Sequence, residues 1–501
     1  MTGLLLFVPV ALAAYLVLVG VYRLYWSSIA HFPGPKLAAL TGLYEIWFDI
    51  VCGGQFTFQI EKLHKKYGPI IRIKPSEVHI SDPDFYSELY TTTAAYQKPG
   101  DWRFRFGFGS ALFDTVDHEH HNRRRAPLAV FFSRSKVLEL SGFIQEQVDK
   151  LVHIINEKYR GQVFCVNQAF DALTMDIIGY YAFGLSYHSI EYPNFDSPFD
   201  AVTEDVARLV HVAGHFPWIV TILKALPQGL MQFLSPPLKK ISKFQKEIGT
   251  QIQNIKSGQN NRSAEKTVSR KTIFHEILNS KLDPSELTQD RLQQEAGSLV
   301  GAALETSKMT ISLAIYYILS KPEIHSRLLE ELEAAMPNPE KPLSVPELER
   351  LPYLSAVIKE ALRLSIGVSQ RIRRYHSAPI QYKSYTIPPG TVFGMCHWQQ
   401  LRDPQIWESP DEFLPDRWLG KNPKALNGQS LDKYFVPFHR GPRMCLGMYM
   451  GQAQLYMSLA TLFRRVDLEL FETGIDSVRI VEDYFVPLRK RGALGVRVRV
   501  K

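Results

Sequence analysis

The sequence predicts a mostly α-helical chain with small β-sheets, preceded by one N-terminal transmembrane helix. Apolar residues recur at helical spacing from about residue 137 to about residue 335. Strand-like patterns are short; the clearest are residues 70–73 and 78–80, which we expect to pair. No internal repeat and no convincing interdomain linker divides the 501 residues. One large domain is therefore expected after the first helix.

The first element is an uncharged, almost wholly apolar run at residues 4–21, just long enough to cross a bilayer. No lysine or arginine precedes it, whereas Arg23 and Lys36 follow it. A cleaved signal peptide normally carries basic residues before its apolar stretch, so this order of charges favours a retained anchor with a cytosolic body. A buried core helix and a cleaved signal peptide are the alternatives.

These signals divide the chain into three parts. Residues 1–22 are interpreted as the transmembrane anchor and residues 23–35, which end in Pro-Gly-Pro, as a proline-rich linker. Residues 36–501 are interpreted as one globular domain.

The composition excludes several classes of protein. Hydrophobic residues make up 45% of the chain and charged residues 22%, a balance that builds a large core and excludes a disordered chain. Four cysteines are too few for a disulfide scaffold. The net charge of +8 is spread thinly, without a basic tract, which argues against a nucleic-acid partner. A mildly basic surface suits an acidic protein partner or an anionic membrane.

A single cysteine near the C-terminus has the surroundings of a cofactor ligand. Cys445 lies between Gly441 and Gly447, just before a helical pattern at residues 448–463. The N-terminal end of a helix lowers the pKa of a thiol, and glycines let the backbone approach a flat cofactor. Arg443 can reach an anionic group on the edge of that cofactor. A lone thiolate is neither a zinc nor an iron–sulfur site, so it suits an axial ligand of a macrocycle.

The alternative is a buried structural cysteine, which is the interpretation for Cys52, Cys165 and Cys396. However, the segment matches F-x-x-G-x-R-x-C-x-G from Phe438 to the last glycine, and it resembles the haem-binding loop of the cytochrome P-450 superfamily. The resemblance implies the cytochrome P-450 fold and haem b, with Cys445 as the axial thiolate ligand of the iron. It also assigns the cofactor-binding residues of the loop, which are Phe438, Gly441, Arg443 and Gly447.

Two further motifs support this resemblance. Glu360 and Arg363 stand three residues apart on a predicted helix, where opposite charges can meet. Arg417 follows in an aromatic- and proline-rich segment. By resemblance, Glu360, Arg363 and Arg417 form the structural triad that locks the segment presenting the cysteine loop.

Residues 290–320 are expected to form one long helix with an apolar middle that crosses the core. Glu305 and Thr306 lie in this middle, where polar groups are costly unless they are paired or used. We interpret them as the catalytic residues that deliver protons to oxygen; a satisfied polar pair is the alternative. The stretch resembles the family's A-G-x-D/E-T motif, although Ala303 stands where glycine is usual.

Three residues are expected at the edge of the cofactor. A histidine-rich stretch ends at His121, but the arginines at 123–125 would oppose a metal ion there. The stretch resembles the family's haem-edge helix, so His121 and Arg125 are expected to bind haem propionates. Arg371 matches another propionate-binding position.

The resemblance implies a membrane-bound haem-thiolate monooxygenase that inserts one atom of O₂ into an apolar small molecule. No flavin or nicotinamide fingerprint is visible, so electrons are expected from NADPH through a partner reductase at the endoplasmic reticulum membrane. Residues 79–86 and 125–133 resemble fungal secondary-metabolism members near trichodiene oxygenase, which favours a terpenoid or related substrate. The expected substrate-pocket residues, each with core packing as its alternative, are Phe104, Phe106, Phe108, Ala302 and Val368.

Two other functions remain open. One is a haem-thiolate isomerase or dehydratase, which would turn over without O₂, NADPH or a reductase. The other is a non-enzymatic haem-binding sensor, which needs no acid–hydroxyl pair beside its cofactor.

Overall fold

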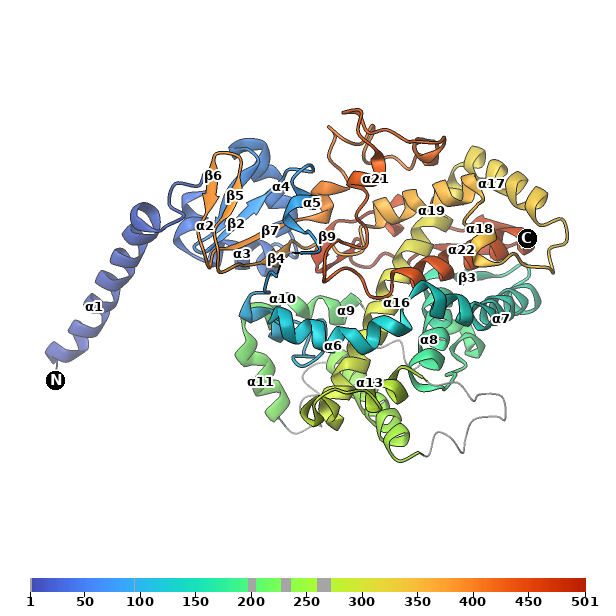
Figure 1. The fold of residues 1–501 in the computed structure, drawn as a ribbon, viewed down its shortest axis with the longest axis horizontal. Helices are drawn as coiled ribbons and strands as arrows, with labels where there is room; N and C mark the ends of the chain where they lie inside the picture. The colour runs from blue at the N-terminus through green and yellow to red at the C-terminus, as the bar shows by residue number, and fades with distance from the viewer. Residues whose placement is uncertain (1, 94, 197–203, 227–235, 259–271) are drawn as a thin grey trace.

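The computed structural model describes residues 2–93, 95–196, 204–226, 236–258 and 272–501. Most of the strands lie at one end of the molecule, near α1, and the long helices gather at the other (Figure 1). The longer helices are α1 Thr2–Val21, α4 Phe56–Tyr67, α6 His118–Phe131, α7 Arg134–Lys158, α8 Val166–Phe183, α11 Pro217–Ala225, α13 Pro236–Lys256, α16 Gln289–Ser320, α17 Pro322–Ala335, α19 Pro352–Ser365 and α22 Met448–Arg465.

Shorter helical turns join these elements. The short α-helices are α2 Lys36–Leu40, α3 Leu43–Ile46, α5 Tyr86–Leu89, α9 Glu204–Ala207, α10 Leu209–His215, α15 Ile273–Leu278, α18 Val345–Leu348, α20 His397–Gln400 and α21 Leu431–Tyr434. The π- and 3₁₀-helical turns are η1 Tyr22–Trp26, η2 Trp47–Val51, η3 Gly100–Phe104, η4 Ser189–Glu191, η5 Pro193–Phe195, η6 Pro284–Leu287, η7 Pro415–Trp418 and η8 Ile475–Ser477.

Helix α16 is the central element of the helical part. Its N-cap Thr288 accepts a hydrogen bond from the backbone N–H of Arg291, and the helix ends at Ser320, two residues before Pro322. It packs against α8, α13, α19 and α22. Its bounds confirm the long helix predicted at residues 290–320, and α22 confirms the helix predicted after Cys445.

The strands form small sheets, as predicted. The largest has the order β1-β2-β7-β4, and β1 and β2 are antiparallel with Ile71 opposite His79, which confirms the predicted pair. Strand β7 joins β2 in parallel from the other end of the chain. The strand bounds are β1 Ile70–Lys74, β2 Glu77–Ile80, β3 Val163–Cys165, β4 Ile372–Arg374, β5 Ile380–Tyr382, β6 Tyr385–Ile387, β7 Val392–Met395, β8 Leu468–Leu470, β9 Glu482–Tyr484, β10 Val486–Leu488 and β11 Arg497–Val500.

Helix α1 extends away from the body (Figure 1). The stretch Val8–Trp26 is long and apolar enough to cross a membrane by length and composition, and none of it is buried. The segment expected to be a linker is packed rather than free: Ile29 and Phe32 are buried against the small sheet, and the backbone N–H of Arg72 donates to Pro33 O at 2.7 Å. A side chain at Gly34 would meet Arg72 O, so this approach requires glycine.

Candidate active site

A cavity of about 870 Å³ lies between α16, the cysteine loop and the tip of the β9–β10 hairpin. Its walls also include residues 105–113, helix α10 and the loop that follows α19. Cys445 lines this cavity near the start of α22. One internal space therefore joins the cysteine loop to an apolar chamber.

The cysteine loop is held by its own backbone and by a close approach to residues 90–91. The backbone N–H of Cys445 donates to Phe438 O at 2.9 Å. Gly441 has a φ of +80°, and a Cβ there would lie 2.9 Å from Tyr90 O, so only glycine fits. Gly447 is the N-cap of α22. The loop thus presents one thiol at a fixed place in the cavity wall.

Cys445 lines the cavity, and the residue is exposed rather than packed in the core. Desolvation of its thiol by the surrounding protein raises the pKa, while the backbone N–H of Gly447 and the charge of Arg125 act in the opposite direction. The other cysteines differ from one another: Cys396 is buried as expected, but Cys165 is half-buried and Cys52 is exposed. The expectation of three buried structural cysteines was therefore right only for Cys396.

Five lysine and arginine side chains line the cavity. Arg105 donates to Gln370, and we call the other four, which lie beside this loop, the cavity cations: Lys98, Arg125, Arg374 and Arg443. Within the described ranges, none of them has a carboxylate at ion-pair distance. Arg443 instead donates to the carbonyl oxygens of Thr115 at 2.6 Å and Val116 at 2.8 Å, and its Nε has no partner. Burying charge without a counter-charge is costly, so these groups fit an anionic cofactor.

The pKa values of the cavity residues show that burial and neighbouring cations outweigh the nearby carboxylates. Burial and the charges of Arg374 and Arg125 lower the pKa of Arg443 to about 9. Burial and the charges of Arg443 and Arg374 lower the pKa of Lys98 well below its usual value. Burial and the charges of Arg443 and Lys98 lower the pKa of His121, which also lines the cavity, to about 2. Two carboxylates of a bound cofactor would reverse these shifts.

The structure does not bring Arg371 to this group, contrary to the sequence-based expectation. Its guanidinium is fully buried and pairs with Glu45 and Glu77, each at 2.5 Å. Arg374, three residues later, lines the cavity instead. Alternation along the chain explains the difference, because residues 371 and 373 face one side of the strand and residue 374 the other.

Glu305 and Thr306 both line the cavity from the middle of α16. The hydroxyl of Thr306 donates to Ala302 O at 2.8 Å. Glu305 does not pair with Thr306: its Oε1 accepts from Lys308 Nζ at 2.7 Å, and the same ammonium lies 3.1 Å from Asp171 Oδ2. Sequence reasoning missed Lys308, although its position three residues after Glu305 on one helical face was a usable signal.

Four of the five expected pocket residues line the cavity: Phe106, Phe108, Ala302 and Val368. Phe104 does not, because it lies at the end of η3 with 46% of its surface exposed. The ring of Phe108 packs where Gly297 of α16 has no side chain, and a Cβ there would come within 2.7 Å of the ring.

An aromatic residue from the far C-terminal part of the chain completes this wall. Phe485 joins β9 to β10 with a φ of +77°, an unfavourable conformation for a bulky residue. Its carbonyl accepts from the backbone N–H of Ser369 at 3.0 Å. Its ring packs edge-on against Phe106 and Phe113, with centroids 4.7 and 5.4 Å away. No sequence pattern linked this residue to the others.

The expected triad is assembled away from the cavity. Glu360 Oε1 accepts from Arg363 Nη2 at 2.8 Å and from Arg417 Nε at 3.1 Å, and its Oε2 accepts from Trp418 Nε1 at 2.8 Å. Arg363 also donates to the carbonyl oxygens of Leu401, Pro410 and Glu412. Glu360 and Arg363 are completely buried, so the pair fixes the segment from 401 to 418 on α19.

The comparisons with known proteins agree with this site. The family described as cytochrome P-450 matches residues 34–481. The cytochrome P-450 monooxygenase orf6 of Eupenicillium brefeldianum is 68% identical over 496 residues, covering 98% of each chain. Orf3 of the same organism, with the same description, is 61% identical over 96% of this chain and 94% of its own. The cytochrome P-450 monooxygenase sdnE of Sordaria araneosa is 41% identical over 97% of this chain and 96% of its own.

Proposed function

Because this chain belongs to the cytochrome P-450 family, we propose that Cys445 is the axial ligand of haem iron and that the cavity cations hold the haem propionates. The family binds haem through a cysteine thiolate and the matched relatives are named monooxygenases, so the chain is a haem-thiolate monooxygenase. The observation that carries the residue assignment is the thiol of Cys445 in one cavity with four cations that lack carboxylate partners. We propose the same division of the chain as above, with residues 36–501 as the catalytic domain.

Bound haem supplies the oxidising chemistry: one atom of O₂ enters a C–H or C=C bond of the substrate and the other leaves as water, with uptake of two electrons and two protons. The protein has to deliver the protons and exclude bulk water. Thr306 carries a proton on Oγ1 at the cavity side of α16, where its bond to Ala302 O orients the hydroxyl. We propose that the carboxylate of Glu305 takes up protons and passes them to Thr306 Oγ1 through ordered water, with Lys308 holding the carboxylate in place.

We propose that the substrate is an apolar small molecule, a terpenoid or related secondary metabolite. The chamber wall supports this, since it is built from Phe106, Phe108, Val368 and Phe485. Such a wall binds by apolar contact and shape and offers few hydrogen bonds. The matched relatives come from fungi and are named for the same class of enzyme.

We propose that the electrons come from an NADPH-dependent cytochrome reductase on the same endoplasmic reticulum membrane. The span at Val8–Trp26 supports membrane attachment, as do the exposed apolar side chains of Leu37, Leu43, Trp47 and Val51 nearby in the chain. The net charge of +8 suits an acidic partner.

The test is the optical spectrum of the reduced, CO-bound protein in membranes. Thiolate ligation gives a strongly red-shifted band, and the Cys445→Ser variant is expected to lose that band or the haem itself. A wild-type band typical of histidine ligation, or an unchanged spectrum in the variant, would contradict the assignment of Cys445. Product formed without NADPH or O₂ would favour an isomerase or dehydratase, and haem binding without any turnover would favour a sensor.

A further inference from the structure

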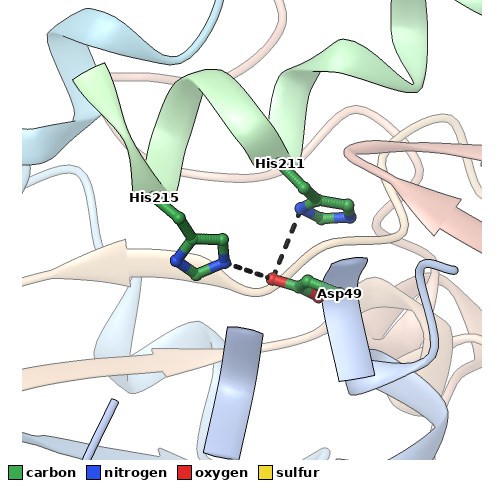
Figure 2. Close-up of side chains that lie close together, drawn as sticks. All are labelled: Asp49, His211 and His215. Carbon is green, nitrogen blue, oxygen red and sulfur yellow. Dashed lines mark hydrogen bonds and ion pairs between the residues drawn. The ribbon is translucent and has the colours of Figure 1, made fainter. Parts of the chain in front are cut away.

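Three metal-ligating side chains converge outside the active-site cavity (Figure 2). Asp49 comes from the turn η2, whereas His211 and His215 come from one face of α10, four residues apart. Asp49 Oδ2 lies 3.3 Å from His211 Nδ1 and 2.9 Å from His215 Nε2, and the ligand atoms all lie within 4.8 Å of one another. Asp49 and His211 are buried, and His215 keeps 10% of its side chain exposed.

The hydrogen bonds of His211 leave one ring nitrogen facing the carboxylate without a partner. Its Nε2 lies 2.6 Å from Asp483 O, and because a carbonyl only accepts, this nitrogen carries the hydrogen. When the ring is neutral, Nδ1 therefore carries a lone pair instead of a hydrogen. This nitrogen points at the carboxylate oxygen of Asp49 and makes no hydrogen bond. Two electron-rich atoms in such contact need a cation or a second proton between them.

The carboxylate of Asp49 lies beside imidazoles rather than permanently charged groups, and it is hydrogen-bonded to His215. Across the described residues, its ion-pair partners are His211 and His215 alone, with no lysine or arginine at that distance. Glu45, on the turn just before it, is by contrast paired with both Lys74 and Arg371. The carboxylate of Asp49 is therefore available to a cation held together with the two imidazoles.

Two of the three separations are close to those of a zinc coordination shell. With bonds of about 2.0–2.1 Å in a tetrahedral shell, neighbouring ligand atoms lie about 3.3 Å apart. Both distances to Asp49 Oδ2 are close to that value. Two imidazoles and one carboxylate suit Zn²⁺ rather than Ca²⁺ or Mg²⁺, which prefer all-oxygen shells.

We propose that Asp49, His211 and His215 bind a Zn²⁺ ion that fastens α10 to η2. Other residues of α10, among them Val210 and Ala213, line the active-site cavity. The hydrogen bond from His211 to Asp483 O also ties the site to the hairpin that carries Phe485. The ion would thus hold two walls of the substrate chamber without contacting the haem site, which is a role beyond the proposed function.

The test uses the full-length, haem-loaded protein in detergent, with its affinity tag removed and metals stripped by a chelator. Titration with Zn²⁺ alone in a calorimeter is expected to show one strong site per chain. Asp49→Asn and His215→Ala should weaken it on the order of 100-fold or more. His153→Ala, which removes an exposed histidine on α7, should leave the affinity unchanged.

Equal affinity in the wild type and both variants, or no stoichiometric binding to the wild type, would overturn the proposal. If the variants lose their haem spectrum, zinc-edge X-ray absorption of the wild-type protein with one Zn²⁺ per chain decides instead. Two imidazoles with an oxygen donor in the coordination shell would support the site. A shell of sulfur, or of oxygen alone, would overturn it.

Discussion

Buried arginines lie on both sides of strand β4, and the two sides differ in their partners. On one side, Arg371 pairs with Glu45 and Glu77, and Arg373 pairs with Glu77. Burial disfavours these charges, but the carboxylates outweigh it and raise the pKa of both arginines. On the other side, Arg374 belongs to the cavity cations, and burial lowers its pKa.

The difference separates structural charges from ligand-binding ones. A buried charge whose counter-charge is supplied by the protein holds the fold together. Removing one partner leaves the other buried without a counter-charge. A buried charge without a counter-charge destabilises the protein alone and is stabilised by a bound anion. We therefore expect opposite outcomes when arginines on the two sides of β4 are replaced.

The largest effect is expected on the paired side. Arg371→Met leaves Glu45 and Glu77 buried with fewer positive partners, which should lower the free energy of unfolding by about 3–5 kcal/mol. Urea unfolding followed by fluorescence measures this change. If Arg371→Met instead lost haem while keeping the wild-type free energy of unfolding, Arg371 would be the propionate-binding residue after all.

On the unpaired side, Arg374→Met should speed haem loss by about 10–100-fold, or about 1.4–2.7 kcal/mol, without destabilising the haem-free protein. Transfer of haem to an excess of a haem-free globin measures the rate. Arg440→Met is the matched control, because Arg440 lies in the cysteine loop but donates to Ser87 and to the carbonyls of Asp432 and Lys433. If Arg374→Met and Arg440→Met lost haem at the same rate, Arg374 would not be a ligand-binding charge, and the two sides of β4 would not differ in this way.

The Thr306→Ala variant tests whether product formation can be lost while haem binding is kept. Product formation should fall about tenfold or more because proton delivery is impaired, while haem retention stays at the wild-type level. Thr306→Ser keeps the hydroxyl and should retain most of the rate. A sensor without turnover would show no difference among the three proteins.

The smallest effect concerns pH in the haem-free protein. Burial and the charges of Arg443 and Lys98 lower the pKa of His121 to about 2. Below pH 6.5, this histidine is therefore protonated in the unfolded chain but stays neutral in the folded chain. The contribution of neutral His121 to the free energy of unfolding is thus fully present above pH 6.5 and is lost as the pH falls toward 2. At pH 5.5 His121→Asn should recover about 1 kcal/mol of the loss, measured by urea unfolding at pH 7.5 and 5.5, and His153→Asn should recover none.

Local patterns in the sequence were sufficient for the main elements and for the centre of the site. Helical spacing predicted α16 and α22, and alternation predicted the β1–β2 pair. The spacing of glycines around Cys445 indicated a cofactor loop, and the structure places that thiol in the cavity wall. These features depend on residues close together in the chain, which is where sequence patterns are informative.

What could not be predicted depends on which side of an element a residue faces, or on segments that meet only in the fold. Position 371 and position 374 are both arginine, and only the pairing of β4 decides which one reaches the cavity. Phe485 lines the cavity but was not predicted, because the hairpin that carries it is remote in sequence from the other wall residues. Asp49 and the histidines of α10 are likewise brought together only by tertiary packing.

The cavity cations come from four distant segments: the loop before η3, helix α6, strand β4 and the cysteine loop. The second edge of strand β2 also forms its backbone hydrogen bonds only when β7 has been synthesised. During synthesis, a ribosome must therefore release nearly the whole chain before the cofactor can be captured, and contacts of such sequence separation form slowly. A cell short of haem would accumulate chains whose cavity cations lack a counter-charge, and chains destabilised in this way are the ones that quality-control proteases degrade.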